Sequence, residues 1–304
     1  MPICIPDDLP AKETLESENI STIPAERASH QDIRPLRIAI LNLMPTKIDT
    51  ETQLLRLLGN SPLQVEIELV RTASYESRHT PKEHLSRFYT SFDEIKKRRY
   101  DGLIVTGAPV ETMPFEEVLY WRELCDIFAW SEKNVFSTFS ICWGAQAALY
   151  YFYGIDKQLL PRKLFGVYEH RVEAPNCPLV RGFDERFLAP HSRHTETPLA
   201  DVLAHPEITP LAVSDDAGLY LALARGGRQV FVTGHSEYDR DTLASEYFRD
   251  LERGLHTAKP EHYFPEGNEL LPPLCTWRGH ANLLYVNWLN FVYQETPFDL
   301  GSLL

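Results

Sequence analysis

Cysteine is scarce in this sequence. The 304 residues contain five, with no paired spacing: Cys4, Cys125, Cys142, Cys177 and Cys275. An odd, sparse set argues against a disulfide framework and favours a reducing compartment, so we expect a cytoplasmic protein. No run of about 18 apolar residues is present, so we expect no membrane-spanning segment. The N-terminus has neither a basic region nor an apolar core, so we expect no secretory signal.

Several ligand-binding motifs are also missing. The sequence has no GxGxxG and no GxxxxGK, so we expect neither a nicotinamide nor an ATP site. It has no HExxH and no CxxC, and the three-residue spacing of His191 and His194 alone does not predict a metal centre. The formal net charge is 30 − 43 = −13, which argues against a nucleic-acid partner.

What is present is typical of a folded enzyme. Hydrophobic residues make up 43% of the chain and charged residues 24%, as in ordinary globular proteins. Residues 1–35 are polar and rich in proline, so we interpret them as an N-terminal arm with little regular structure. We expect residues 36–304 to form a single catalytic domain.

Strands and helices alternate from residue 36 onward. Apolar runs predict strands, and apolar residues at helical spacing predict helices between them. This alternation predicts an α/β fold with a mostly parallel, doubly wound sheet. The predicted strands are 37–43, 65–70, 100–106 and 135–140, and the predicted helices are 46–58, 92–99, 115–132 and 143–153.

The second half of the chain has a different pattern. Short apolar runs at 164–168, 211–213, 219–223 and 229–233 predict further strands, part of them antiparallel. Arg225-Gly226-Gly227-Arg228 has the composition of a hairpin turn. Two more helices are predicted at 240–255 and 281–293.

The segment Ser140-Ile141-Cys142-Trp143-Gly144 is the sharpest local feature. A predicted strand runs into Cys142 and a predicted helix leaves it, as at the elbows that expose a nucleophile. The helix N-terminus favours a thiolate, which is the attacking form of cysteine. The backbone N–H of Trp143 is a candidate oxyanion donor. The alternative is a buried, unreactive cysteine, which is common.

A base for this thiol is predicted at the end of another strand. His235 and Glu237 are two residues apart, so at a strand end their side chains lie on one face. Glu237 can then orient the imidazole, as in nucleophile–base–acid triads. The alternative is a structural histidine. The carboxyl ends of parallel strands, where we expect both Cys142 and His235, are where ligand sites of α/β proteins gather.

These residues resemble the class I glutamine amidotransferase-like fold and, more closely, the homoserine O-acyltransferases of methionine biosynthesis. The resemblance covers nearly the whole chain. It is carried by long segments, among them IRPLRIAILNLMPTKIDTETQLLRLLGNSPLQVEIELVRT, YDGLIVTGAPVE, CWGAQAALYYFYGI, KLFGVYEHRV, FLAPHSRHTE, FVTGHSEYDRDTLASEYFRD and NLLYVNWLNFVYQETPFDL.

The resemblance implies a ping-pong acyl transfer with no cofactor. Cys142 would carry the acyl group of an acyl-CoA as a thioester, and His235, oriented by Glu237, would activate the γ-hydroxyl of L-homoserine. It further implies that Lys163, Ser192 and Arg249 contact substrate, although each alone is an ordinary surface residue type. We place Lys47, just past the first strand, near the pocket. The resemblance also allows a homodimer.

Glu111 is the residue that the resemblance links to the acyl donor. The position after the Gly-Ala-Pro-x turn is associated with Gly in succinyl users and with Glu in acetyl users, and here it is Glu111. Two like charges ~4 Å apart cost about 4 kcal/mol at an effective dielectric of ~20, more than the ~1.4 kcal/mol of a tenfold preference. We therefore predict acetyl-CoA as donor. The alternative is that Glu111 faces solvent and caps the next helix.

Three other functions stay open at this point. The donor could be succinyl-CoA. The same Cys and His-x-Glu elements also serve glutamine amidohydrolases, which release ammonia from glutamine. A binding protein with a decayed site is a third function, against which the intact Cys142, His235 and Glu237 argue. Within the family the acceptor could also be serine, because serine differs from homoserine by one methylene, which is worth only ~1–3 kcal/mol of discrimination.

Overall fold

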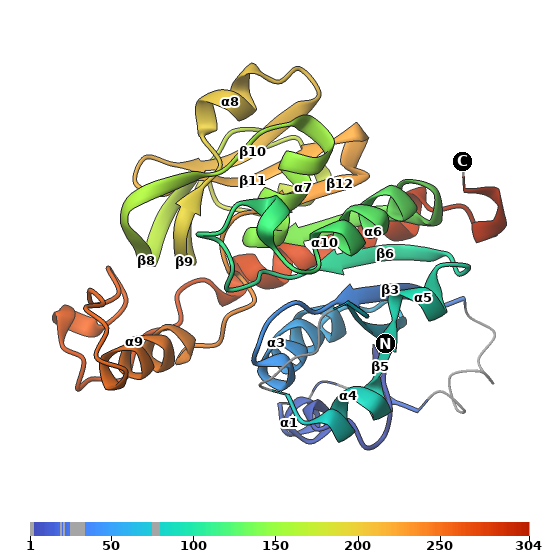
Figure 1. Cartoon of the computed structure of the whole chain (residues 1–304), viewed down its shortest axis with the longest axis horizontal. Coiled ribbons are helices and arrows are strands. Elements are labelled where there is room, and N and C mark those ends of the chain that lie inside the picture. Colours follow the sequence, from blue (N-terminus) through green and yellow to red (C-terminus); the bar gives the residue numbers. More distant parts are fainter. Residues whose placement is uncertain (1–2, 19, 21, 25–33, 75–79, 304) are drawn as a thin grey trace.

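A single mixed sheet organises the chain (Figure 1). The computed structural model describes residues 3–18, 20, 22–24, 34–74 and 80–303. Among these residues the strand order is β2-β1-β4-β3-β6-β7-β12-β11-β10-β8-β9, and β5 also pairs with β4.

One half of the sheet is parallel. Its strands pair in register with successive neighbours, as the βαβ pattern predicts. The predicted parallel α/β sheet is confirmed. The strands are β1 (Ile3–Cys4), β2 (Thr22–Ile23), β3 (Leu36–Leu41), β4 (Val65–Arg71), β5 (Tyr89–Ser91), β6 (Tyr100–Val105), β7 (Val135–Ile141) and β12 (Gln229–Val232).

The other half is antiparallel, as predicted for the second half of the chain. The predicted turn at 225–228 joins β11 to β12 through η3 (Arg225–Gly227), where Gly226 and Gly227 adopt positive φ angles of 64° and 94°. The antiparallel strands are β8 (Gln158–Val172), β9 (Arg186–Glu196), β10 (Ile208–Ser214) and β11 (Gly218–Ala224).

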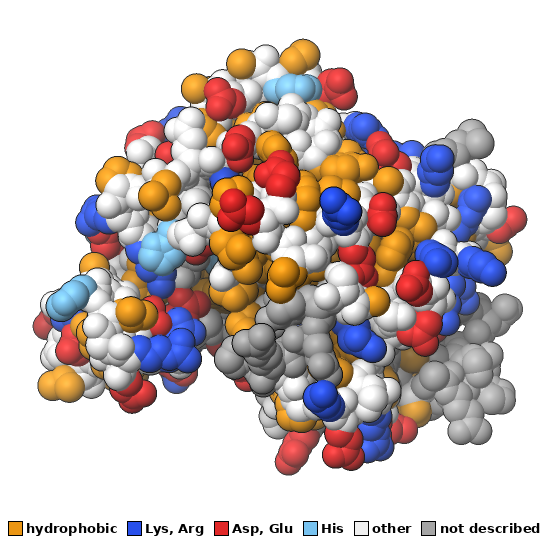
Figure 2. Space-filling view, in the orientation of Figure 1, with side chains coloured by type: hydrophobic (Ala, Val, Ile, Leu, Met, Phe, Trp, Pro, Cys, Tyr) orange, Lys and Arg blue, Asp and Glu red, His pale blue; other side chains and the backbone are white. Residues whose placement is uncertain are grey.

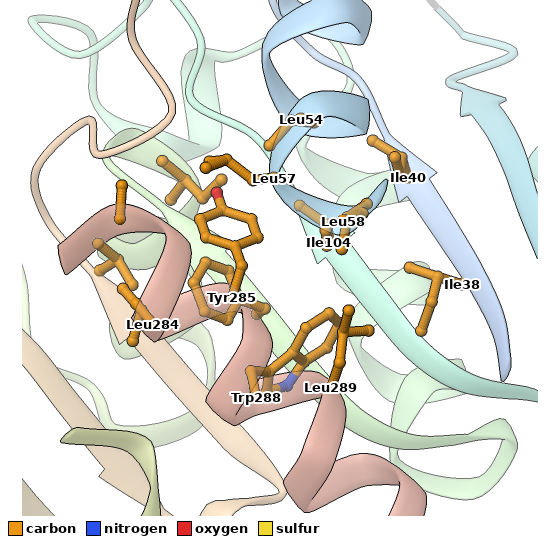
Figure 3. Close-up of a cluster of buried hydrophobic side chains, with 14 of the residues drawn as sticks. Ile38, Ile40, Leu54, Leu57, Leu58, Ile104, Leu284, Tyr285, Trp288 and Leu289 are labelled. Carbon is orange, nitrogen blue, oxygen red and sulfur yellow. The ribbon is translucent and has the colours of Figure 1, made fainter. Parts of the chain in front are cut away.

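Helices cover both faces of the sheet because side chains alternate along each strand. On β3, Ile38 and Ile40 join one core cluster, and Ala39 and Leu41 join the other. Figure 3 shows the first cluster, where Tyr285 and Trp288 on α10 meet leucines of α3 over β3 and β6. This face carries α1 (Ala11–Ser17), α3 (Lys47–Gly59), α4 (Lys82–Phe88) and α10 (Arg278–Glu295); the other carries α5 (Phe92–Ile95), α6 (Trp121–Asn134), α7 (Trp143–Tyr153) and α8 (Leu199–Ala204).

One helix stands away from both faces. Figure 1 shows α9 (Thr242–Glu252) beyond the ends of β8 and β9. A separate apolar cluster fixes it there, in which Leu243 and Tyr247 join Phe165, Tyr263 and Trp277. We call residues 239–277 the α9 lobe. The short 3-10 helices are η1 (Phe115–Glu117), η2 (Pro178–Val180), η4 (Pro265–Gly267) and η5 (Leu300–Ser302).

The expectation of little regular structure in residues 1–35 is wrong for the described part of this segment. β1 extends the sheet beside β4, and Leu15 of α1 is fully buried in the same core as Leu54 and Leu58 of α3. Residues 25–33 lie outside the described residues. The division into an arm and a catalytic domain stays a prediction.

Two predicted helices are shorter than expected, and two strands outside the N-terminal segment, β5 and β9, were not predicted. The segment 92–99 is helical only to Ile95, and Arg98 and Arg99 leave the helix to bond Glu68 and the carbonyl of Leu300. The helix predicted at 115–132 is interrupted at Val118, whose φ and ψ of −71° and 124° are extended. The helices α4 and α8 were not predicted either.

Truncation of Leu15 tests whether the N-terminal segment is part of the core. We expect Leu15→Ala to lower the free energy of unfolding by about 2–5 kcal/mol, because it leaves a cavity between α1 and α3. Urea denaturation of the whole chain measures this. Glu13→Ala, an exposed change on the same helix, should stay within about 0.5 kcal/mol of wild type. Equal stability of Leu15→Ala and wild type would contradict the burial.

Candidate active site

Cys142 sits in the elbow between β7 and α7. Its φ and ψ of 49° and −116° lie outside the regions that a non-glycine residue normally adopts. The backbone holds it there, because the Cys142 N–H donates to the Val232 carbonyl at 2.7 Å. The Cys142 carbonyl accepts from the N–H groups of Ala145 and Gln146 at 3.0 and 3.1 Å. The predicted strand-to-helix elbow is therefore present.

Gly144 makes this elbow possible, and Gly107 lies beside it. A Cβ atom on Gly144 would lie 2.6 Å from the Thr106 carbonyl oxygen, so only glycine lets α7 approach β6 this closely. A Cβ atom on Gly107 would lie 3.4 Å from Cys142 Cβ and 3.5 Å from His235 Cε1. Gly107 therefore lies directly beside the side chains of both Cys142 and His235.

His235 is held by Glu237 and stacked on Tyr238. The Nδ1 atom of His235 lies 2.7 Å from Glu237 Oε1, and both side chains are buried. The rings of His235 and Tyr238 stack with centroids 4.2 Å apart. Because Nδ1 is bound to Glu237, Nε2 is left for Cys142.

The charges around His235 set its protonation. Burial alone lowers the pKa of His235, but the negative charges of Cys142 and Glu237, and hydrogen bonds to both side chains, together raise it well above its ordinary value. A raised pKa favours an imidazolium beside the sulfur.

One cavity of about 940 Å³ collects most of the predicted site residues. The structure brings together, on its wall, Cys142, His235, Glu111, Lys163, Ser192 and Arg249. Glu237 lies behind His235 and does not line the cavity.

Glu246 on α9 connects two parts of the cavity and was not predicted. Its Oε2 accepts a hydrogen bond from Ser192 Oγ at 2.5 Å, and its Oε1 accepts one from Tyr238 at 2.9 Å. Lys163 Nζ lies 3.6 Å from the same carboxylate. Nothing local in the sequence marks Glu246, because its partners come from β9, from β8 and from the loop after β12.

Asp250 pairs with both cationic residues of this wall that were predicted to contact substrate, Lys163 and Arg249. Lys163 Nζ is 3.7 Å from Asp250 Oδ2 and 3.9 Å from the ring centre of Phe165. Arg249 donates to Asp250 Oδ1 from Nε and Nη2 at 2.9 and 2.8 Å. The wall therefore alternates two cations with two carboxylates, which suits a zwitterion.

Glu111 faces the cavity. Its Oε2 accepts a hydrogen bond from the backbone N–H of His194 at 2.8 Å, which fixes the carboxylate against β9. Both residues line the cavity, and Glu111 is only partly exposed. This contact with His194 differs from the alternative, in which Glu111 faces solvent and caps the next helix.

The other two predicted site residues, Trp143 and Lys47, do not line the catalytic cavity. Trp143 begins α7, so its N–H points out of the helix start, and its fully buried ring contacts Phe115 and Tyr120. Its oxyanion role stays a prediction. Lys47 lines a second cavity, where its amine donates to the carbonyls of Asn42 and Met44. Burial lowers the pKa of Lys47 to about 8.

Within the described residues, no group of three or more His, Cys, Asp and Glu side chains could hold a metal ion. Over the same residues, no helix combines the length and apolar character that crossing a membrane needs.

Comparison with known sequences identifies the family. The profile of the family described as Homoserine O-succinyltransferase matches residues 2–298. The chain belongs to this family. Several relatives carry the name homoserine O-acetyltransferase. That of Acetivibrio thermocellus is 62% identical over all of both chains, that of Geobacillus kaustophilus 59% over 98% of this chain and 99% of its own, and that of Bacteroides fragilis 56% over all of both.

Solved structures show the same fold at low identity. A glutamine amidotransferase of Thermotoga maritima superposes with a TM-score of 0.53 at 12% identity, covering 86% of this chain and all of its own. One of Methylobacillus flagellatus gives 0.53 at 11%, covering 85% and 95%. The predicted glutamine amidotransferase-like fold is confirmed, and at this identity the likeness concerns the fold alone.

Replacement of Glu237 tests how the base is held. Glu237→Gln removes a negative charge that raises the pKa of His235, so the imidazolium should lose its proton at lower pH. We expect the alkaline limb of kcat/KM to move to lower pH and the maximum to fall by about 10²–10⁴-fold. A pH profile of acyl transfer measures both.

The control is Glu207→Gln, an exposed acid away from the cavity. It makes the same change in net charge and should leave the profile in place. An alkaline limb that stays fixed in Glu237→Gln would contradict the pairing with His235.

Proposed function

We propose that this protein acts as a homoserine O-acetyltransferase in methionine biosynthesis, moving an acetyl group from acetyl-CoA to the γ-hydroxyl of L-homoserine. The observation that carries the proposal is the 56–62% identity, over almost full length, to relatives with that name. The cavity wall also carries side chains that suit this reaction. They are the Cys142 thiol with the His235 imidazole, the charged residues that could bind an amino acid, and the Glu111 carboxylate.

The first half-reaction forms a thioester on Cys142. The thiolate attacks the carbonyl carbon of acetyl-CoA, and the tetrahedral oxyanion lies near the start of α7, where the Trp143 N–H is available. The carbon–sulfur bond to CoA then breaks. The departing thiolate of CoA takes the proton of the His235 imidazolium, which leaves neutral imidazole and acetyl-Cys142.

The second half-reaction transfers the acetyl group to oxygen. The γ-hydroxyl of homoserine gives its proton to Nε2 of His235 as its oxygen attacks the thioester carbonyl. The bond to Cys142 sulfur breaks, so the thiolate is restored beside an imidazolium. The product is O-acetylhomoserine, and no cofactor takes part.

The polar wall is suited to the amino-acid end of homoserine. Arg249 is exposed within the cavity and can present its guanidinium to the α-carboxylate. The α-ammonium fits beside Glu246, which already accepts hydrogen bonds from Ser192 and Tyr238. Lys163 balances the charge of the acidic pair.

The position of Glu111 supports acetyl over succinyl. A succinyl group would bring a second carboxylate to the wall where Glu111 is fixed by His194. Like charges at ~4 Å cost about 4 kcal/mol at an effective dielectric of ~20, which is enough to exclude the larger donor.

The cellular setting is proposed on separate grounds. All five cysteines are free thiols in the structure, which fits the cytoplasm. The homodimer that the resemblance allows stays a prediction.

Intact-mass spectrometry tests the covalent step. Acetyl-CoA added without homoserine should give one acetyl adduct per chain, because the thioester cannot be discharged. Hydroxylamine or homoserine should remove the adduct, and Cys142→Ala should never form it. Ammonia release from glutamine in place of the adduct would instead identify a glutamine amidohydrolase.

Replacement of Glu111 tests the choice of donor. Glu111→Gly should raise kcat/KM for succinyl-CoA relative to acetyl-CoA by at least tenfold, because it removes both charge and volume. Glu111→Gln removes the charge and keeps the volume, so a rise in both variants assigns the effect to charge. Competition between the two donors measures the ratio, and an unchanged ratio in Glu111→Gly would exclude Glu111 from donor choice.

A further inference from the structure

A second cavity adjoins the catalytic one. It measures about 430 Å³, and the two cavities share Met44, Pro45, Thr46, Pro109 and Arg249 on their walls. A long ligand can therefore extend from Cys142, past Pro109, into the second space. The two half-reactions proposed at Cys142 and His235 do not use this second cavity.

The second cavity is cationic in an acidic protein. Four of the described residues that line it are cations, and none of the described ones is Asp or Glu: the four are Lys47, Arg71, Arg249 and Arg253. The catalytic cavity beside it has several acids on its wall, Glu246 and Asp250 among them. In a chain of net charge −13, this local excess of positive charge favours an anionic ligand.

Arg71 is the strongest evidence that the second cavity binds an anionic ligand. It ends β4, at the carboxyl edge of the parallel strands where ligands of α/β proteins bind. Its Nε atom is buried and has no hydrogen-bond partner in the described part of the chain. A buried donor without an acceptor is costly, and because Arg71 also lines the cavity, an anion there would lie beside a guanidinium that no described acceptor neutralises at Nε.

The surroundings of Arg71 match the same ligand. Burial lowers the pKa of Lys47, the charge of Glu51 raises it and the charge of Arg71 lowers it, so an anion beside Arg71 would relieve the repulsion between the two cations. Arg253 approaches from the α9 lobe, and Figure 2 shows Lys and Arg side chains gathered on the part of this lobe that faces the body of the molecule. Apolar side chains, including Leu85, Val110 and Met113, complete the wall.

We propose that the second cavity binds the phosphate-bearing adenosine end of the acyl-CoA donor, with Arg71 and Arg253 donating hydrogen bonds to its phosphates. The inference rests on the proposed function and deepens it. Guanidinium groups bind phosphate oxygens through paired N–H donors, and apolar walls suit a purine ring. The pantetheine arm then crosses Pro109 and delivers the thioester to Cys142.

The test compares two donors that differ in phosphate. Acetyl-CoA carries the phosphates, and acetyl-pantetheine has the same thioester without them. We expect Arg71→Gln to raise KM for acetyl-CoA by about 10–100-fold, because a hydrogen bond to a charged group is lost. KM for acetyl-pantetheine and for homoserine should change by less than twofold.

Three further variants complete the test: a charge-conserving one, a second one at the phosphate site and a control outside both cavities. Arg71→Lys keeps the charge and should recover part of the affinity for acetyl-CoA. Arg253→Gln alters an exposed residue, so it should raise KM for acetyl-CoA without affecting folding. Arg37→Gln removes an exposed arginine paired with Glu66 on β4, outside both cavities, and should change neither donor.

Direct binding separates this inference from the proposed function. Calorimetry should show CoA itself binding to wild type at least tenfold more tightly than to Arg71→Gln, whether or not acetyl transfer occurs. Failure of wild type to transfer acetyl would overturn the proposed function alone. An equal loss with both donors in Arg71→Gln, or equal CoA binding by wild type and Arg71→Gln, would overturn the role of the second cavity.

Discussion

Cys142, the proposed nucleophile, has backbone angles that a non-glycine residue disfavours. A positive φ at Cys142, with a ψ that no regular element shares, costs of order 1–3 kcal/mol. Strands β6 and β12, on either side of β7, hold it there. The carbonyl of Val232 binds the Cys142 N–H, and the carbonyls of Val105 and Thr106 leave room only for glycine at position 144. The nucleophile is therefore positioned by the order of parallel strands, not by its loop alone.

The antiparallel half of the sheet positions the base in the same way. The His235 N–H donates to the carbonyl of Pro190 on β9 at 2.8 Å, and a Cβ atom on Gly234 would lie 3.0 Å from that oxygen. Ser192, two residues further along β9, then faces Glu246 of α9. One strand thus sets the distance of both the imidazole and the substrate-facing hydroxyl from Cys142.

The sequence predicts the parts of the fold and site that depend on neighbouring residues, and it misses the parts that depend on contacts between distant residues. The elbow at Cys142 and the His235–Glu237 pair are local, so their spacing identifies them, and apolar periodicity identifies the parallel strands. β9 is different, because His191 and Arg193 point inward and give the strand a polar composition typical of a loop. Glu246 and Arg71 matter only through residues far away in sequence, and no local pattern marks either. Strands as short as β1 depend on a partner strand for their existence.

Charge balance explains how this buried site can change its chemistry between the two halves of the proposed reaction. Arg193 is buried, as His235 and Glu237 are, and its guanidinium donates to the carbonyls of Thr195 and Ala217, with no carboxylate of the described residues in a salt bridge to it. A thiolate at Cys142 would be stabilised by both cations, because its charge acts on His235 and on Arg193. Acetylation removes the charge of Cys142, which is one of the causes that raise the pKa of His235. In the proposed reaction the imidazole then holds its proton less tightly, so His235 would act as a neutral base when homoserine loses its hydroxyl proton.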